Sequence, residues 1–211
     1  MHQCKNGGMS DSPGLRQRQR ERTWRDLHEA AVALAREHGI EGATIEAIAE
    51  RAGVSRRTFF NYYPSKEDAI LGLNAPQVAT SAVEAFRAQA PESLFPAVIQ
   101  LVSSVWRSTV VVDIGRPARR AIVHEFPPVR GRMGEHAGAV EDQVAEVIVE
   151  GNARYDLGLS DDPRTLRSLV LLASAVLKVT DGPDGTATTP RSQETIDDTI
   201  DLFTRLLHGE R

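Results

Sequence analysis

Several residue types are scarce in this sequence of 211 residues, and each scarcity excludes a class of protein. The single cysteine, Cys4, rules out an internal disulfide and a cysteine-based zinc finger. The longest strongly apolar stretch, Leu169 to Leu177, has nine residues, whereas a bilayer-spanning helix needs roughly 20. The first twenty residues contain no apolar segment of the kind that a secretion signal requires. We therefore expect a cytoplasmic protein that does not enter a membrane.

Lysine is also rare, and the positive charge is concentrated near the start of the chain. The chain has a net charge of −4, so a local basic segment stands out. Such a segment on an acidic protein indicates one end that binds a polyanion. The alternative is a solvated arginine-rich tail. The segment contains five arginines within ten residues: Arg16, Arg18, Arg20, Arg22 and Arg25.

The periodicity of apolar residues predicts an all-α fold. From Trp24 to Ala35 the apolar residues recur on one helix face, and Gly39 suits the position just after a helix end. No stretch alternates as a β-strand would. Residues 1–14 are small and polar, and we expect them to form a disordered tail. Further helices are expected over about 77–90, 92–112, 116–126, 133–155, 163–180 and 192–209.

Residues 44–63 have the pattern of a helix-turn-helix. Thr44 can cap a first short helix, Gly53 can end it, and Ser55 can cap a second one. Two helices this short cannot bury enough surface alone. The preceding long helix is therefore expected to complete a three-helix unit.

The flanks of the second short helix carry two further signals. Val54 and Phe59 have the spacing of a hydrophobic staple, which fixes the entry of the chain into the helix. Ser65 and Asp68 have the spacing of a capping box. They predict a fourth helix that opens at Ser65, after Pro64 has ended the second short helix.

The second short helix is suited to reading DNA. Phe59 and Tyr63 lie four residues apart and can face the core, so that Arg56 and Arg57 point outward. An arginine can pair with guanine through two hydrogen bonds in the major groove. Helix N-termini, where Thr44 and Lys66 stand, favour phosphate. The alternative is that these residues are simple caps and a solvated face. The candidate DNA-binding residues are Thr44, Ser55, Arg56, Arg57, Phe60, Asn61, Tyr62 and Lys66.

This segment resembles the DNA-binding domain of the TetR family of bacterial transcriptional regulators. The resemblance implies a DNA-binding domain over 15–75, with its helix-turn-helix at 44–63, and an effector-binding and dimerisation domain over 76–211. It implies a ligand-responsive regulator of transcription, usually a repressor. Many members have a small residue where this chain has Arg57, and this departure bears on the DNA sequence that is read. The matching residues are Thr44, Ile48-Ala49, Ala52-Gly53-Val54-Ser55, Thr58 to Tyr63, and Ser65-Lys66-Glu67.

The last two expected helices favour a homodimer. The helix at 163–180 is apolar on nearly every side, and the helix at 192–209 has an apolar stripe. We expect the two helices to pair with their copies in a second subunit, because operators are commonly read by proteins with two-fold symmetry. The alternative is the core of a monomer. The expected partners are thus double-stranded operator DNA and a second copy of the chain.

The helices from about residue 76 onward are expected to bind a small apolar or amphipathic effector. A ligand that favours one spacing of the two recognition helices would shift the population and release DNA. The helix that opens at Ser65 joins the two domains, and we expect it to transmit the effect of the ligand to the recognition helix. The candidate effector-binding residues, each of which could instead belong to the core, are Phe86, Phe95, Trp106, His124, Phe126 and Met133.

Two other functions, an enzyme and a partner-binding module, have some support in the sequence. Asp197-Asp198-x-x-Asp201 matches a Mg²⁺–diphosphate motif of helical prenyl-transferring enzymes. However, the motif lies on the solvent-exposed face of an amphipathic helix, and the sequence has no second acidic motif to face it. We therefore expect no enzyme. A helical partner-binding module without DNA binding is disfavoured by Arg56, Arg57 and Lys66. The six histidines lack the spacing of metal ligands, so no metal is expected. The sequence contains no P-loop and no G-x-G-x-x-G motif, and no cofactor is expected.

Overall fold

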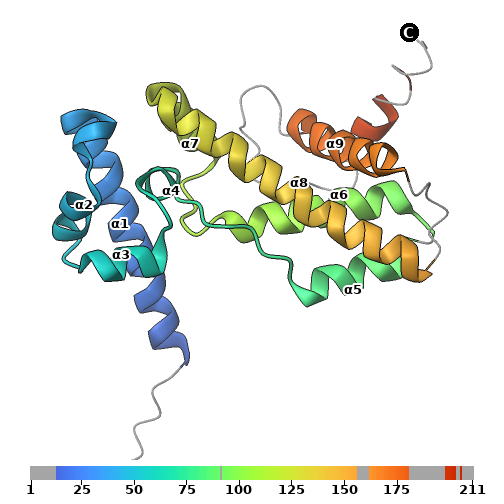
Figure 1. Ribbon diagram of the computed structural model, residues 1–211, viewed down its shortest axis with the longest axis horizontal. Coiled ribbons are helices and arrows are strands. Elements are labelled where there is room, and N and C mark those ends of the chain that lie inside the picture. The colour runs from blue at the N-terminus through green and yellow to red at the C-terminus, as the bar shows by residue number, and fades with distance from the viewer. Residues whose placement is uncertain (1–12, 91, 156–161, 181–197, 203–204, 206–211) are drawn as a thin grey trace, which may run out of the picture.

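A computed structural model describes residues 13–90, 92–155, 162–180, 198–202 and 205 (Figure 1). This part of the chain is helical, with one isolated bridge between Leu73 and Val110, and the predicted all-α fold is confirmed. None of the described helices is both long and apolar enough to cross a membrane. The helices are α1 (Pro13–Gly42), α2 (Ile45–Arg51), α3 (Arg56–Tyr62), α4 (Lys66–Leu71), α5 (Thr80–Gln89), α6 (Leu94–Thr109), α7 (Arg116–Glu125), α8 (Pro127–Tyr155) and α9 (Pro163–Thr180).

The predicted caps of the short helices are present. The side-chain oxygen of Thr44 accepts a hydrogen bond from a backbone N–H in the first turn of α2, and Ser55 and Ser65 do the same for α3 and α4. Gly53 has a φ of +68°, which lets the chain turn sharply between α2 and α3. Gly39, with a φ of +72°, interrupts α1 close to its end, where the sequence predicted a helix stop.

The structure corrects three of the predicted boundaries. Residues 13 and 14, which were expected in the tail, begin α1, while residues 1–12 lie outside the described residues. The helix expected from residue 77 begins at Thr80, because the chain before it is held against α6, where the N–H of Gln77 donates a hydrogen bond of 2.8 Å to the hydroxyl of Ser108. The helix expected from residue 133 begins at Pro127, since proline is favoured in the first turn of a helix. Most of the helix expected at 192–209 also lies outside the described residues.

Two apolar cores stand at opposite ends of the molecule. The first unites α1–α4 with Ile122 of α7 and Val129 of α8. The second lies among α5, α6, α8 and α9 and includes Val102 and Val170. Helix α8 runs from one core to the other (Figure 1). Helix α4, which follows the helix-turn-helix, therefore packs directly against α7 and α8.

Candidate nucleic-acid interface

Helix α3 buries one face and exposes the other. Phe59 and Tyr63 are fully buried in the first core, as their spacing predicted. Arg57 and Asn61 are exposed on the other side. Phe60 beside them is 46% exposed, an unusual state for so large an apolar ring. The outer face of α3 thus combines arginine, amide and aromatic groups, which suit contacts with bases and phosphates.

Arg56 is held loosely on this face. Its guanidinium forms an ion pair of 3.0 Å with Glu46 of α2 and stands 5.7 Å from the centre of the Phe60 ring. Both charged side chains of the pair are more than half exposed. An exposed ion pair contributes at most about 1 kcal/mol. Phosphate or guanine can therefore compete with Glu46 for Arg56.

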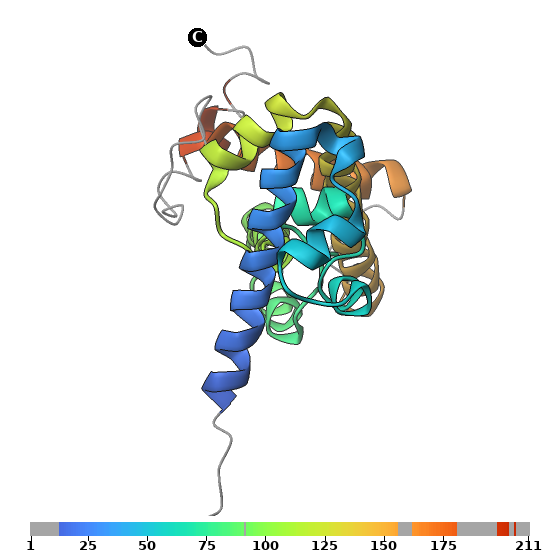
Figure 2. The same ribbon diagram turned by 90° about the vertical axis from the view of Figure 1, so that its left-hand side faces the viewer.

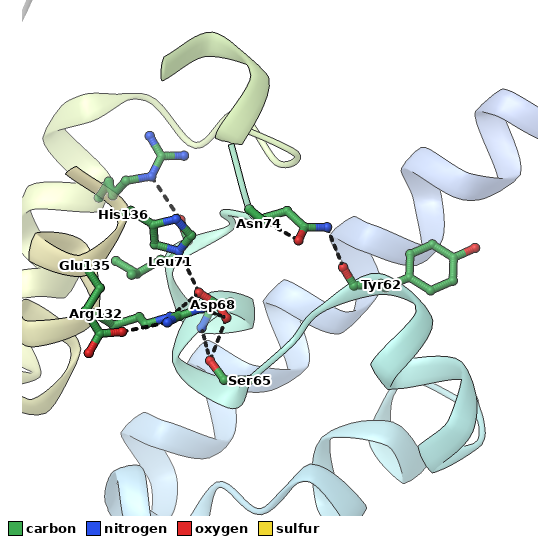
Figure 3. Close-up of polar contacts among 10 residues, drawn as sticks. Tyr62, Ser65, Asp68, Leu71, Asn74, Arg132, Glu135 and His136 are labelled. Atoms are coloured by element: carbon green, nitrogen blue, oxygen red, sulfur yellow. Dashed lines mark hydrogen bonds and ion pairs between the residues drawn. The ribbon is translucent and has the colours of Figure 1, made fainter. Parts of the chain in front are cut away.

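The C-terminal end of α3 is fixed by its last carbonyl. The carbonyl oxygen of Tyr62 accepts hydrogen bonds from Trp24 Nε1 at 3.2 Å and from Asn74 Nδ2 at 3.0 Å; the Asn74 contact is visible in Figure 3. The rings of Trp24 and Tyr62 meet edge to face, 5.5 Å apart. Tyr62, which the sequence predicts as a DNA contact, is therefore half-buried against α1. Its role at DNA stays a prediction.

The predicted phosphate anchors differ in their availability. Thr44 is exposed at the start of α2, and Ser55 at the start of α3. Lys66, by contrast, donates a hydrogen bond of 2.8 Å to the carbonyl of Ile40, and its side chain is only 20% exposed. Contact of Lys66 with a phosphate therefore requires the ammonium group to share or leave this bond.

A buried charge cluster joins α4 to α8 (Figure 3). Both carboxylate oxygens of the fully buried Asp68 accept hydrogen bonds from Arg132, at 2.7 and 2.8 Å. His136 Nε2 lies 2.6 Å from one of these oxygens, and the hydroxyl of Ser65 donates to the other at 2.7 Å. Burial by itself would raise the pKa of Asp68, but the bonds from His136, Arg132 and Ser65 outweigh it and lower the pKa to about 2.

The other end of α4 is held by α1 and α7. His28 Nδ1 lies 2.8 Å from the carbonyl oxygen of Ala69, and burial lowers the pKa of this histidine. Arg119 donates to the carbonyls of Leu71 and Val112, at 2.9 and 3.0 Å. The bonds to Ala69 and Leu71 satisfy carbonyls at the end of α4. Helix α4, which we expect to transmit the effect of a ligand, is thus anchored at both of its ends.

Sequence reasoning did not find these anchors. The capping-box spacing identified Asp68 only as a residue of the first turn of α4. Arg119, Arg132 and His136 come from helices more than 40 residues away in the sequence, and no local spacing connects them to α4. Asp68 directly follows Lys66 and Glu67 in the first turn of α4, where an acidic residue is ordinary, so no signal in the sequence marked it as buried.

The arginine-rich segment forms the start of α1. Figure 2 shows this end of the helix extending away from the rest of the molecule. The side chains of residues 14–22 are exposed. Arg20 stacks over the ring of Trp24 at 4.5 Å, and Arg22 lies 3.7 Å from Asp26. The positive charge is therefore carried on a helix rather than on an irregular tail.

The structure does not bring the six predicted effector-binding residues together. Of these, Phe86, Phe95 and Trp106 pack into or against the second core, and Phe126 and Met133 into or against the first. The remaining residue, His124, is exposed. Their role in effector binding stays a prediction.

Two open grooves lie elsewhere in the described residues, and none of the six candidates lines either of them. One of about 450 Å³ runs between α8 and α9, and one of about 460 Å³ between α5 and α8. In the acidic motif of the enzyme alternative, Asp197 lies outside the described residues, while Asp198 and Asp201 are exposed.

Comparison with known proteins identifies the family. Residues 27–71, which comprise most of α1 together with α2–α4, match the family described as bacterial regulatory proteins of the tetR family. The HTH-type transcriptional regulator TcmR of Streptomyces glaucescens is 31% identical over 179 residues, which are 80% of this chain and 76% of that protein. A crystal structure of a protein assigned to the same family, from Mesorhizobium loti MAFF303099, superposes with a TM-score of 0.38 and 19% identity over 89% of this chain and 97% of the other. On the first two matches, this chain belongs to the TetR family of DNA-binding transcriptional regulators.

Proposed function

We propose that this protein is a ligand-released repressor that acts in the cytoplasm as a homodimer on a palindromic operator. The observation that carries the proposal is the two-sided character of α3. Its inner face is buried through Phe59 and Tyr63, and its outer face presents Arg56, Arg57 and Asn61. A short helix with such an outer face fits the major groove, where arginine and asparagine can read base edges.

The remaining DNA contacts are assigned to groups around α3. Thr44 and Ser55 stand at the exposed starts of α2 and α3, where backbone N–H groups favour phosphate. The start of α1 supplies further positive charge. An α-helix rises about 1.5 Å per residue, so Arg16 lies about 12 Å ahead of Trp24 along α1. That reach suits phosphates beyond the groove that α3 enters.

Exposed apolar side chains on α8 and α9 support the homodimer. Val149 of α8 and Leu171, Leu172 and Val179 of α9 are each more than 40% exposed. Val149 and Leu171 also line the same groove between α8 and α9, so exposed apolar side chains of the two helices share a surface there. Such a surface is typical of a protein interface. Pairing of this surface with its copy would bury it and set the spacing of the two recognition helices.

The effector is proposed to bind in the groove between α5 and α8. Val78, Val83 and Val147 line this groove together with the charged residues Arg87, Glu146 and Glu150. Of the expected effectors, an amphipathic molecule suits this mixed lining better than a purely apolar one. Gln143, also in its wall, donates a hydrogen bond of 3.1 Å to the carbonyl of Pro76, between α4 and α5. A ligand here would therefore act on the connection between the DNA-binding helices and the rest of the chain.

The test begins with DNA duplexes recovered by the wild-type protein from a random-sequence pool. Their affinities are then measured by fluorescence anisotropy for the wild type, for Arg56→Ala/Arg57→Ala and for Arg120→Ala/Arg130→Ala. The last variant removes the same charge from exposed positions on α7 and α8. We expect a two-fold symmetric site, and a loss of specific affinity of at least about tenfold in the α3 variant only.

Recovery of no preferred sequence by the wild type would refute the proposed function. Equal losses in the two double variants would show that only net positive charge matters, which contradicts readout by α3.

A further inference from the structure

Asn74 connects the last residue of α6 to the last residue of α3. Its backbone N–H donates a hydrogen bond of 2.8 Å to the carbonyl of Thr109, and its side-chain Nδ2 donates one of 3.0 Å to the carbonyl of Tyr62. Figure 3 shows the amide pointing from the chain after α4 to the end of α3. One residue therefore joins a helix of the second core to the proposed recognition helix.

The backbone around Asn74 is firmly attached to the end of α6. Leu73 pairs with Val110, and the N–H groups of Val111 and Val112 both lie 3.2 Å from the carbonyl oxygen of Gly72. Thr109 itself is fully buried. The position of Asn74 is therefore tied to that of the end of α6.

The acceptor on α3 has two donors from different directions. A carbonyl oxygen has two lone pairs, and that of Tyr62 accepts from Trp24 of α1 as well as from Asn74. A helix of seven residues has little stability of its own and takes its orientation from its neighbours. Trp24 ties the end of α3 to α1, whereas Asn74 ties it to α6.

We propose that Asn74 is a positioning residue for DNA recognition, which sets the orientation of α3 relative to α6. This inference rests on the proposed function, in which the outer face of α3 reads base pairs. Loss of the Asn74 side-chain bond leaves α3 folded but free to tilt. Contacts with base edges then weaken, while contacts with phosphates, which tolerate small shifts, persist.

The deciding variant is Asn74→Asp, with Gln77→Glu as its matched control. Aspartate keeps the size of the side chain but presents an oxygen to the Tyr62 carbonyl where Asn74 presents a donor, and the backbone bond to Thr109 is untouched. Gln77→Glu makes the same chemical change at an exposed amide in the same connection, three residues further on, whose backbone N–H contacts Ser108 of α6 rather than α3. The pair separates the effect of an added negative charge from loss of the bond to α3.

Affinity is measured by anisotropy against a duplex recovered from the random pool and against a scrambled duplex. We expect Asn74→Asp to lose about tenfold in affinity for the recovered duplex, or about 1.4 kcal/mol, which is within the range for the loss of one hydrogen bond. Its affinity for the scrambled duplex should stay within about twofold. Gln77→Glu should keep both affinities. A merely structural role would lower the folded fraction and both affinities together, which thermal unfolding would reveal.

The inference is overturned if Asn74→Asp binds the recovered duplex as the wild type does, or if Gln77→Glu loses as much affinity. If Asn74→Asp fails to fold, Asn74→Ala removes the donor without adding charge and carries the same expectation. Absence of any preferred duplex for the wild type is a different result, because it refutes the proposed function itself and this inference with it.

Discussion

Replacing Asp68 with asparagine tests the charge cluster that joins α4 to α8. Asparagine has nearly the same size, but it cannot balance the charge of Arg132 and offers only one oxygen to three donors. Asp68 is fully buried, so water cannot take over the missing contacts. Removal of one member of a buried ion pair typically costs about 3–5 kcal/mol, and we expect Asp68→Asn to be destabilised by that amount at neutral pH.

The pH dependence gives this prediction a second, independent part. The pKa of Asp68 is lowered from its ordinary value of 3.8 to about 2, which corresponds to about 2.5 kcal/mol of stability at neutral pH. Because the folded-state pKa is the lower one, this stability is present above pH 4 and is lost as the pH falls toward 2. About half of it should remain at pH 3.

The assay is urea unfolding followed by circular dichroism at pH 7, 5, 4 and 3. The difference between wild type and Asp68→Asn removes the contribution of the other titrating groups, and it should shrink by about 1 kcal/mol between pH 5 and pH 3. Asp26→Asn, which removes an exposed carboxylate 3.7 Å from Arg22, is the control and should unfold like the wild type. A difference below about 1 kcal/mol at pH 7, or one that does not change with pH, would refute the reasoning.

Three further predictions concern α8, α9 and α1. Gly134→Ala and Gly138→Ala should each raise the free energy of unfolding by about 0.8–1 kcal/mol, because an added Cβ meets nothing within 4 Å and alanine favours the helix; destabilisation in urea would contradict this. Leu171→Glu should convert a dimer into a folded monomer in light scattering, and an unchanged mass would contradict the proposed interface. Arg16→Ala/Arg18→Ala should lower the slope of log affinity against log salt concentration by about 0.9 for each lost phosphate contact, without changing the preferred DNA sequence, whereas an unchanged slope would exclude the start of α1 from the interface.

The helix-turn-helix could be predicted because its signals are local. Thr44, Ser55 and Ser65 each cap a helix within three residues of themselves, and Gly53 allows a turn at its own position. The alternation of Phe59 and Phe60 between core and solvent follows from helical periodicity. Each of these features depends on short-range geometry that the sequence encodes directly.

Where long-range contacts compete with local patterns, the sequence was a poorer guide. The pattern after Gly72 predicted a helix from residue 77, but contacts of Asn74 and Gln77 with the end of α6 hold this stretch, and the helix begins only at Thr80. Phe86 and Phe126 were both predicted to bind the effector because they are large and apolar, yet they belong to different cores. Periodicity identifies a buried face without identifying its partner.

By itself, the sequence determined the all-α fold, the helix-turn-helix and the family, because caps, turns and a buried stripe arise within a few residues of one another. Only the tertiary structure decided how this unit is held. It brought Arg132 and His136 to Asp68 and turned Asn74 toward Tyr62. It also engaged Lys66 with Ile40. Such contacts depend on how whole helices pack against one another. The free energy that favours one arrangement of the helices comes from many contacts in both cores, so no local pattern in the sequence predicts it.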